Sequence, residues 1–123
     1  MIRYCPRCWA ENAYEAAYCV TCAADLRQPE PGDRVDRLIA SLAHPVPDLR
    51  RMVAWLLGKT RDPRALQALA AGAQRAVDEK DWALLDGIVQ GLAEFHSAET
   101  APALTFIARH GPVGARSAAA EAL

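Results

Sequence analysis

The chain has 123 residues, a hydrophobic content of 52% and a formal net charge of −1, from 14 basic and 15 acidic residues. This length suits one ordinary domain, or a small module followed by a short repeat array. The balanced charge excludes the basic field that drives nonspecific nucleic-acid binding, and the longest apolar stretch, residues 52–58, is too short to cross a bilayer.

The first eight residues contain two arginines and two cysteines with no apolar run behind them, which is not the pattern of a signal peptide. We therefore expect a soluble protein of the reducing cytoplasm, with no membrane partner. Cysteines in that compartment are more often metal ligands than disulfides.

All four cysteines lie in residues 1–28, as two C-x-x-C pairs separated by ten residues. Two such turns facing each other provide the four thiolates of a tetrahedral zinc site. We predict one structural zinc ion, held by Cys5, Cys8, Cys19 and Cys22. A redox pair is the alternative, but redox C-x-x-C motifs occur singly before a helix. A catalytic zinc would need an open coordination position, and four thiolates leave none.

Residues around the two pairs also match a known pattern. They are Cys5-Pro6-Arg7-Cys8, Asn12, Tyr18-Cys19, Cys22 and Leu26. In these positions residues 3–27 resemble short bacterial zinc ribbons, which implies metal binding but no particular activity. Trp9 and Ala23 stand where the ribbons carry glycine, so we expect strain of about 1 kcal/mol at such a position. Trp9 either covers the metal site, the interpretation we favour, or forms a contact surface.

Two prolines and a glycine in residues 29–32 predict a linker between two separable modules. Residues 1–28 form the metal-binding module, and residues 33–123 form a repeat array. A segment as short as the first module has no core of its own, so we expect it to unfold without metal while the array stays folded.

Apolar residues at helical spacing predict six helices, which begin near residues 33, 49, 62, 81, 97 and 115. An aspartate stands at the start of three of them: Asp33, Asp62 and Asp81. The fourth helix has a predicted inward-facing stripe, formed by Trp82, Leu85, Ile88, Leu92 and Phe95.

Leucines repeat at fixed intervals: Leu57 and Leu69 are 12 residues apart, and so are Leu92 and Leu104. This repetition predicts a mainly α fold, a short α-solenoid of three stacked helical hairpins. The predicted hairpins are residues 33–58, 62–95 and 97–123.

The second helices of the first and third hairpins, residues 49–58 and 115–123, both carry an arginine at their second position and a leucine at their ninth. They resemble the Val-Arg-x-x-Ala-x-x-x-Leu-Gly helix of HEAT-like repeats of the phycocyanobilin-lyase type. The resemblance spans residues 33–123 and implies a superhelix whose second helices line a concave binding side. Leu85 replaces the family's arginine, and His44 and His110 replace its loop aspartates. We therefore expect the ion-pair ladder between repeats to be absent or rewired.

A row of residues shares one position on the three second helices, and we predict that it binds a partner. The row consists of Arg51, Trp55, Asp86, Gln90, Ser117 and Glu121. Five of the six are polar, so the row is expected to face solvent. A tryptophan in such a row is typical of an interface anchor. Alternatively, the metal-binding module folds back and buries Trp55.

We interpret the chain as a non-enzymatic adaptor that binds a protein or peptide. The alanine-rich last helix leaves self-association, or further repeats beyond Leu123, open. The two loop histidines lie two repeats apart, so they cannot share a metal, and we expect local hydrogen bonds to satisfy them.

Two alternative functions remain. The first is nucleic-acid binding through the basic and aromatic residues of the metal-binding module, which are Arg3, Tyr4, Arg7, Trp9 and Arg27. The charge of about −2 on zinc with four thiolates disfavours it. The second is a bilin lyase or its chaperone, which the family resemblance alone implies.

Overall fold

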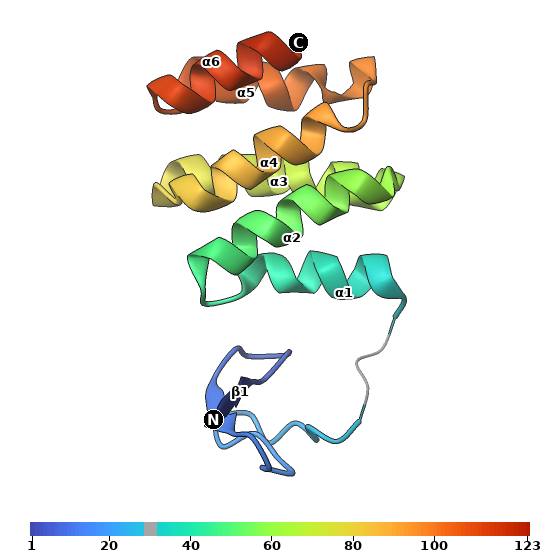
Figure 1. The fold of residues 1–123 in the computed structure, drawn as a ribbon, viewed down its shortest axis with the longest axis vertical. Helices are drawn as coiled ribbons and strands as arrows, with labels where there is room; N and C mark the ends of the chain where they lie inside the picture. Colours follow the sequence, from blue (N-terminus) through green and yellow to red (C-terminus); the bar gives the residue numbers. More distant parts are fainter. Residues whose placement is uncertain (29–31) are drawn as a thin grey trace.

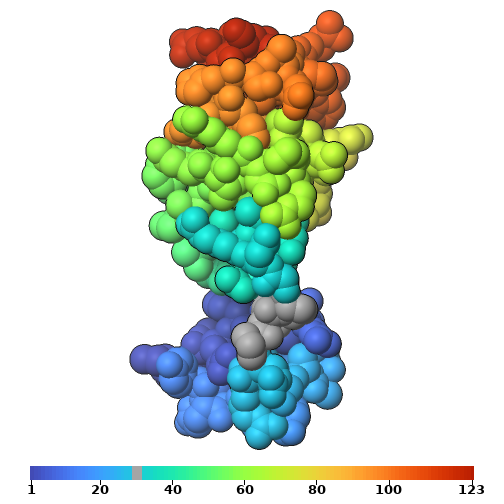
Figure 2. All heavy atoms as spheres, turned by 90° about the vertical axis from the view of Figure 1, so that its right-hand side faces the viewer, coloured from blue at the N-terminus to red at the C-terminus, as the bar shows by residue number. Residues whose placement is uncertain are grey.

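The computed structural model describes residues 1–28 and 32–123 as an elongated molecule (Figure 1). A cysteine module, residues 1–28, forms a separate lobe at one end, and a stack of helices follows it (Figure 2). Three residues of the predicted linker, 29–31, lie outside the described residues. The division into module, linker and array therefore stays a prediction.

The helices fall where the sequence predicts them. Their bounds are α1 Arg34–Ala40, α2 Pro47–Thr60, α3 Pro63–Glu79, α4 Trp82–Ala93, α5 Ala101–His110 and α6 Val113–Ala122. A short 3-10 helix, Ser41–Ala43, follows α1, and a second one, Ala98–Thr100, precedes α5. The prediction of a mainly α fold built from repeated hairpins is confirmed. In residues 1–28 and 32–123, no helix is long and apolar enough to cross a membrane.

Aspartate side chains set where three of the helices begin. Asp33 and Asp36 form a reciprocal capping box at the start of α1. Asp62 accepts a hydrogen bond from the backbone amide of Arg64 at the start of α3, and Asp81 caps α4 in a similar way. Each bond satisfies a backbone N–H that has no partner within its helix, so these starts are determined by local sequence.

The hairpins stack in two layers. The second helices α2, α4 and α6 contact one another in that order and form one layer (Figure 1). The first helices α1, α3 and α5 contact one another in the same order and form the other layer. Each hairpin thus packs mainly on its neighbours, which is the arrangement of an α-solenoid.

One apolar core runs between the two layers. Its fully buried large side chains are Leu57, Leu69, Leu84, Leu85, Ile88, Leu92, Leu104 and Ile107. Trp82 does not join this core as predicted: it is 42% exposed, because the first turn of α4 lies at the loop edge of the stack beside Pro47 and Lys80. Leu123 is 59% exposed, since no described element covers the end of α6.

Helices α2 and α4 approach each other backbone to backbone. A Cβ atom on Gly58 would lie 2.2 Å from the carbonyl oxygen of Gly91. A Cβ atom on Gly91 would lie 2.5 Å from the carbonyl oxygen of Ala54, and one on Gly87 would lie 2.3 Å from that of Arg51. Any side chain at these three positions would push the helices apart, so the contact requires glycine.

A mostly buried ion pair at the loop edge is among those that join the first and second hairpins. Arg50 Nε donates to Asp81 Oδ2 at 2.8 Å, and the two side chains are only 18% and 15% exposed. Arg50 Nη1 also donates to the carbonyl oxygens of His44 and Pro45, at 2.8 and 3.0 Å. Among the described residues, the ion-pair ladder between repeats is therefore rewired rather than absent. Leu85 occupies the position in the second hairpin that corresponds to Arg50 in the first, and it is fully buried in the core.

We predict that replacing Gly91 with alanine destabilises the protein by about 2–3 kcal/mol, because the new methyl group would collide with the α2 backbone. Helix propensity alone predicts that the alanine variant would be more stable than the wild type by up to about 1 kcal/mol. Urea unfolding followed by circular dichroism measures the difference.

Gly114→Ala is the matched control, because nothing lies within 4 Å of a Cβ atom at that position in α6. This variant should be unchanged or slightly stabilised. Equal stabilities for the two variants would contradict the backbone contact between α2 and α4.

Candidate metal centre and binding surface

Two short hairpins present the cysteine pairs. Strands β1 (Ile2–Tyr4) and β2 (Glu11–Ala13) pair antiparallel, with Arg3 opposite Asn12. They flank the turn that carries Cys5 and Cys8. An isolated antiparallel bridge between Tyr18 and Asp25 flanks the second turn, which carries Cys19 and Cys22. The module thus holds each C-x-x-C pair at the end of its own hairpin.

The two cysteine turns share one hydrogen-bond pattern. In the first turn, the Trp9 amide donates to the Cys5 carbonyl oxygen at 2.8 Å, and the Cys5 amide donates to the Ala10 carbonyl oxygen at 2.9 Å. The Arg7 amide points at Cys5 Sγ, 3.4 Å away. The second turn repeats these three contacts with Cys19, Thr21, Ala23 and Ala24. Amides that point at sulfur stabilise thiolates, which is what a metal site requires.

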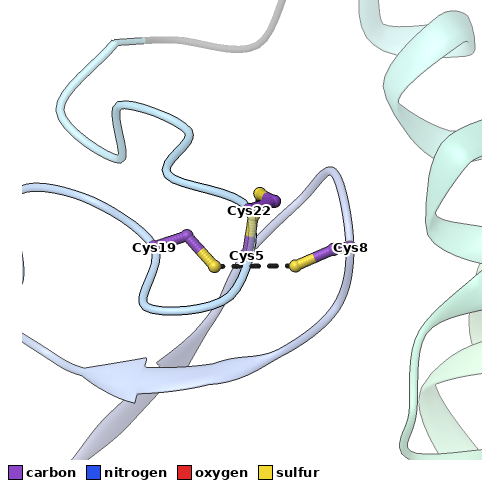
Figure 3. Close-up of side chains that lie close together, drawn as sticks. All are labelled: Cys5, Cys8, Cys19 and Cys22. Atoms are coloured by element: carbon purple, nitrogen blue, oxygen red, sulfur yellow. Dashed lines mark hydrogen bonds between the residues drawn. The ribbon is translucent and has the colours of Figure 1, made fainter.

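The four sulfur atoms lie within 4.8 Å of one another. Cys5 Sγ is 3.6 Å from Cys22 Sγ, and Cys8 Sγ is 3.5 Å from Cys19 Sγ (Figure 3). Tetrahedral zinc with Zn–S bonds of about 2.3 Å separates its sulfurs by about 3.8 Å. The cluster therefore has the size and the donor set of a four-thiolate metal site.

Charge in the cluster is unevenly distributed. The backbone amide of Cys22 lowers the pKa of Cys19 most, and the Thr21 amide and the Asn12 side chain help to bring it to about 6, against the effect of desolvation. At Cys8 a backbone hydrogen bond with Ala10 lowers the pKa, but desolvation and the neighbouring thiols raise it to about 12. One thiolate thus forms readily, whereas four at this distance need a cation to balance their charge.

Asn12 has a role that the sequence pattern did not reveal. It is 4% exposed and lies between the two turns. Its Oδ1 accepts a hydrogen bond from the Val20 amide at 2.9 Å, and its Nδ2 points at Cys19 Sγ from 3.6 Å. Asn12 therefore positions the second turn against the first.

Trp9 and Ala23 both have a left-handed backbone, with φ of 62° and 63°. At these two positions the zinc ribbons that the sequence resembles carry glycine, so the structure contains the expected conformation without the residue that favours it. The Trp9 ring packs against His44 of the helical stack, with ring centroids 5.1 Å apart. This contact corresponds to the second of our two interpretations of Trp9.

The six residues predicted to bind a partner are all exposed. The structure brings four of them together across α2 and α4: Arg51 Nη1 lies 3.9 Å from Asp86 Oδ2, and Gln90 Nε2 donates to the same carboxylate oxygen at 3.1 Å. Ser117 and Glu121 lie on α6, and no hydrogen bond or ion pair joins them to the other four within the described part of the chain. Whether this row binds a partner stays a prediction.

A hollow of about 360 Å³ lies within this group. Its lining residues are Asp48, Arg51, Met52, Trp55 and Gln90. Trp55 is 37% exposed, and the Lys59 ammonium group lies 4.8 Å from the centre of its ring. Met52 and Lys59 were not among the predicted partner-binding residues, although each is within one helical turn of Trp55.

The two histidines have different surroundings. His44 Nδ1 accepts a hydrogen bond from the Val46 amide at 3.0 Å, as expected for a loop histidine satisfied locally. Burial and the nearby Arg50 lower the pKa of His44 below its usual value. His110 is not in a loop as predicted but is the last residue of α5, where its ring lies 4.8 Å from the Phe106 ring.

A family model described as HEAT repeats matches residues 9–80, which is more than half of the chain. The matched range includes α1, α2 and α3, and the stack continues beyond it through α4, α5 and α6. No curated protein and no solved structure matches the chain.

We predict one zinc ion per chain, measured by elemental analysis of the purified protein. Removing it with a chelator should change the near-ultraviolet circular dichroism of the cysteine module but preserve most of the helical signal at 222 nm, because the helices have a separate core. Cys5→Ser should prevent metal binding. A metal-free wild-type protein, or a disulfide between Cys5 and Cys8, would contradict this prediction.

We predict that Ala23→Gly increases zinc affinity about fivefold, because glycine relieves about 1 kcal/mol of strain at a φ of 63°. Competition with a coloured chelator measures the change. Ala24→Gly is the neighbouring control, and it should gain no affinity, since its φ is not positive. Equal gains at the two positions would rule out relief of backbone strain as the cause.

Proposed function

The chain belongs to the HEAT-repeat family, and we propose that it is a non-enzymatic adaptor that binds a protein or peptide through α2 and α4. In the same proposal the cysteine module is a zinc ribbon whose one zinc ion is structural. A set of four thiolates is soft and closed, which favours zinc and leaves no position for a substrate.

The observation that carries the proposal is the half-exposed Trp55 in its hollow. Tryptophan is highly buried on average in folded proteins, and it dominates the binding energy of many interfaces. Met52 beside it is 52% exposed, and Leu49 one turn earlier is 38% exposed. These three side chains provide an apolar centre on one helix.

Polar side chains surround this apolar centre. Asp48 and Arg51 form an exposed ion pair at 3.4 Å, and Lys59 of α2 pairs at 3.6 Å with Glu94, the residue that follows α4. An apolar centre with a polar rim is the usual composition of a protein-binding surface. The charges are balanced in sign, which supports a protein partner over a nucleic acid.

The cysteine module gives little support to nucleic-acid binding. Arg3 donates to the Leu26 carbonyl oxygen at 2.8 Å, and Arg27 pairs with Asp25 at 3.0 Å. Tyr4 and Trp9 both pack against His44. Four of the five residues that could contact nucleic acid thus already have partners within the chain. The phycocyanobilin-lyase alternative rests on the sequence resemblance alone.

We predict that Trp55→Ala weakens partner binding at least tenfold, as expected for a residue at the centre of an interface. The partner is first captured with the wild-type chain by cross-linking in host extract, then purified and titrated against each variant by calorimetry. Trp55→Phe should change the free energy of unfolding by less than about 0.5 kcal/mol.

Trp82→Ala is the matched control, since Trp82 is similarly exposed but lies at the loop edge of the stack. It should bind the partner as the wild type does. Unchanged binding by Trp55→Ala, or equal loss in both variants, would refute the proposed surface.

A further inference from the structure

The cysteine module contacts the helical stack through the ring of His44. We propose that the metal-bound module docks on the stack by holding His44 between Tyr4 and Trp9, so that metal occupancy controls the arrangement of the two parts. We call these three residues the aromatic clamp. The inference rests on the metal site of the proposed function but is independent of the partner surface.

The clamp is a contact of three half-buried rings. The Tyr4 and His44 ring centroids are 4.8 Å apart with an angle of 69° between the planes, an edge-to-face arrangement. The Trp9 and His44 centroids are 5.1 Å apart at 57°. Both distances lie in the range of favourable aromatic contacts. A single imidazole ring therefore touches two residues of the cysteine module at once.

The metal site determines the positions of the Tyr4 and Trp9 rings. Tyr4 directly precedes Cys5, and Trp9 directly follows Cys8, so the rings flank the first cysteine turn on its two sides. The buried apolar core of the module is small: Cys5, Cys19 and Leu26, with three partly buried alanines packed against them. A core this small cannot hold the turn closed without metal. Loss of the ion would let the two rings separate.

The stack holds His44 in place from the other side. Its Nδ1 accepts a hydrogen bond from the Val46 amide, and its carbonyl oxygen accepts one from Arg50 at 2.8 Å. Arg50 is itself paired with Asp81 of the second hairpin. The stack thus determines the position of the His44 imidazole. The positions of the Tyr4 and Trp9 rings depend instead on the fold of the cysteine module.

The clamp also gives the tryptophan at a glycine position a contact that can offset its backbone strain. A side chain at a φ of 62° is strained, and such strain persists where surrounding contacts compensate for it. Ala23 has the same backbone conformation in the second turn but carries no ring to make such a contact. The first turn carries a ring that contacts the stack and the second turn does not. The first turn therefore has a docking role in addition to metal binding.

The test uses the full chain, loaded with zinc or stripped of it. The His44 ring protons should show a ring-current shift by NMR in the loaded protein and lose it without zinc. Backbone ¹⁵N relaxation should show common tumbling of residues 1–28 and the helices when zinc is bound, and faster tumbling of residues 1–28 when it is not. Independent tumbling in the zinc-loaded wild type would overturn the proposal.

Two variants separate docking from metal binding. His44→Ala and Trp9→Gly should each keep one zinc ion per chain by elemental analysis, yet lose common tumbling. His110→Ala, at an exposed histidine away from the clamp, should behave as the wild type does. Common tumbling retained in His44→Ala would overturn the clamp while leaving the metal site intact. A chain that binds no zinc would overturn both.

Discussion

The approach of α2 to α4 at Gly58, Gly87 and Gly91 is the constraint on which the rest of the structure depends. Helices normally pack at 8–10 Å between axes, a distance set by the side chains between them. Without side chains at these three positions, the backbones meet directly. The close approach lets α2 form cross-hairpin ion pairs with the second hairpin from Arg50, Arg51 and Lys59. The hollow beside Trp55 exists for the same reason, because Gln90 of α4 reaches it.

The third hairpin joins the stack differently, which explains why the predicted row of partner residues divides. Leu104 and Ile107 of α5 and Ala119 of α6 are buried in the common core, so this hairpin packs through apolar side chains. The one glycine of α6, Gly114, has open space where a Cβ atom would stand. Ser117 and Glu121 share a register position with the residues of α2 and α4, but no hydrogen bond or ion pair joins them within the described residues. The candidate surface belongs to the first two hairpins.

Local sequence accounts for much of the fold and for the metal ligands, whereas contacts between distant residues could not be predicted. The aspartate caps depend on residues within one turn, and the C-x-x-C spacing depends on the geometry of a single turn. Arg50 and Asp81 are 31 residues apart and meet because glycines bring their helices together. Trp82 fits the apolar period of α4, but periodicity does not indicate that the first turn of this helix borders an open hollow at the loop edge. Likewise, nothing in the sequence near Trp9 pointed to His44 as its contact.

Helix α2 connects the two sites of the molecule. Near its start, Arg50 binds the His44 and Pro45 carbonyl oxygens and pairs with Asp81, so the His44 loop is attached to two hairpins at once. Arg51 of the candidate surface is the next residue on this helix, and Trp55 follows one turn later. An α-helix is stiff over this distance, and the glycine contact with α4 holds it further. A cysteine module docked on His44 would therefore have a fixed position relative to the partner surface. In an adaptor this would present the module and a bound partner at a defined separation, which a flexible connection alone cannot do.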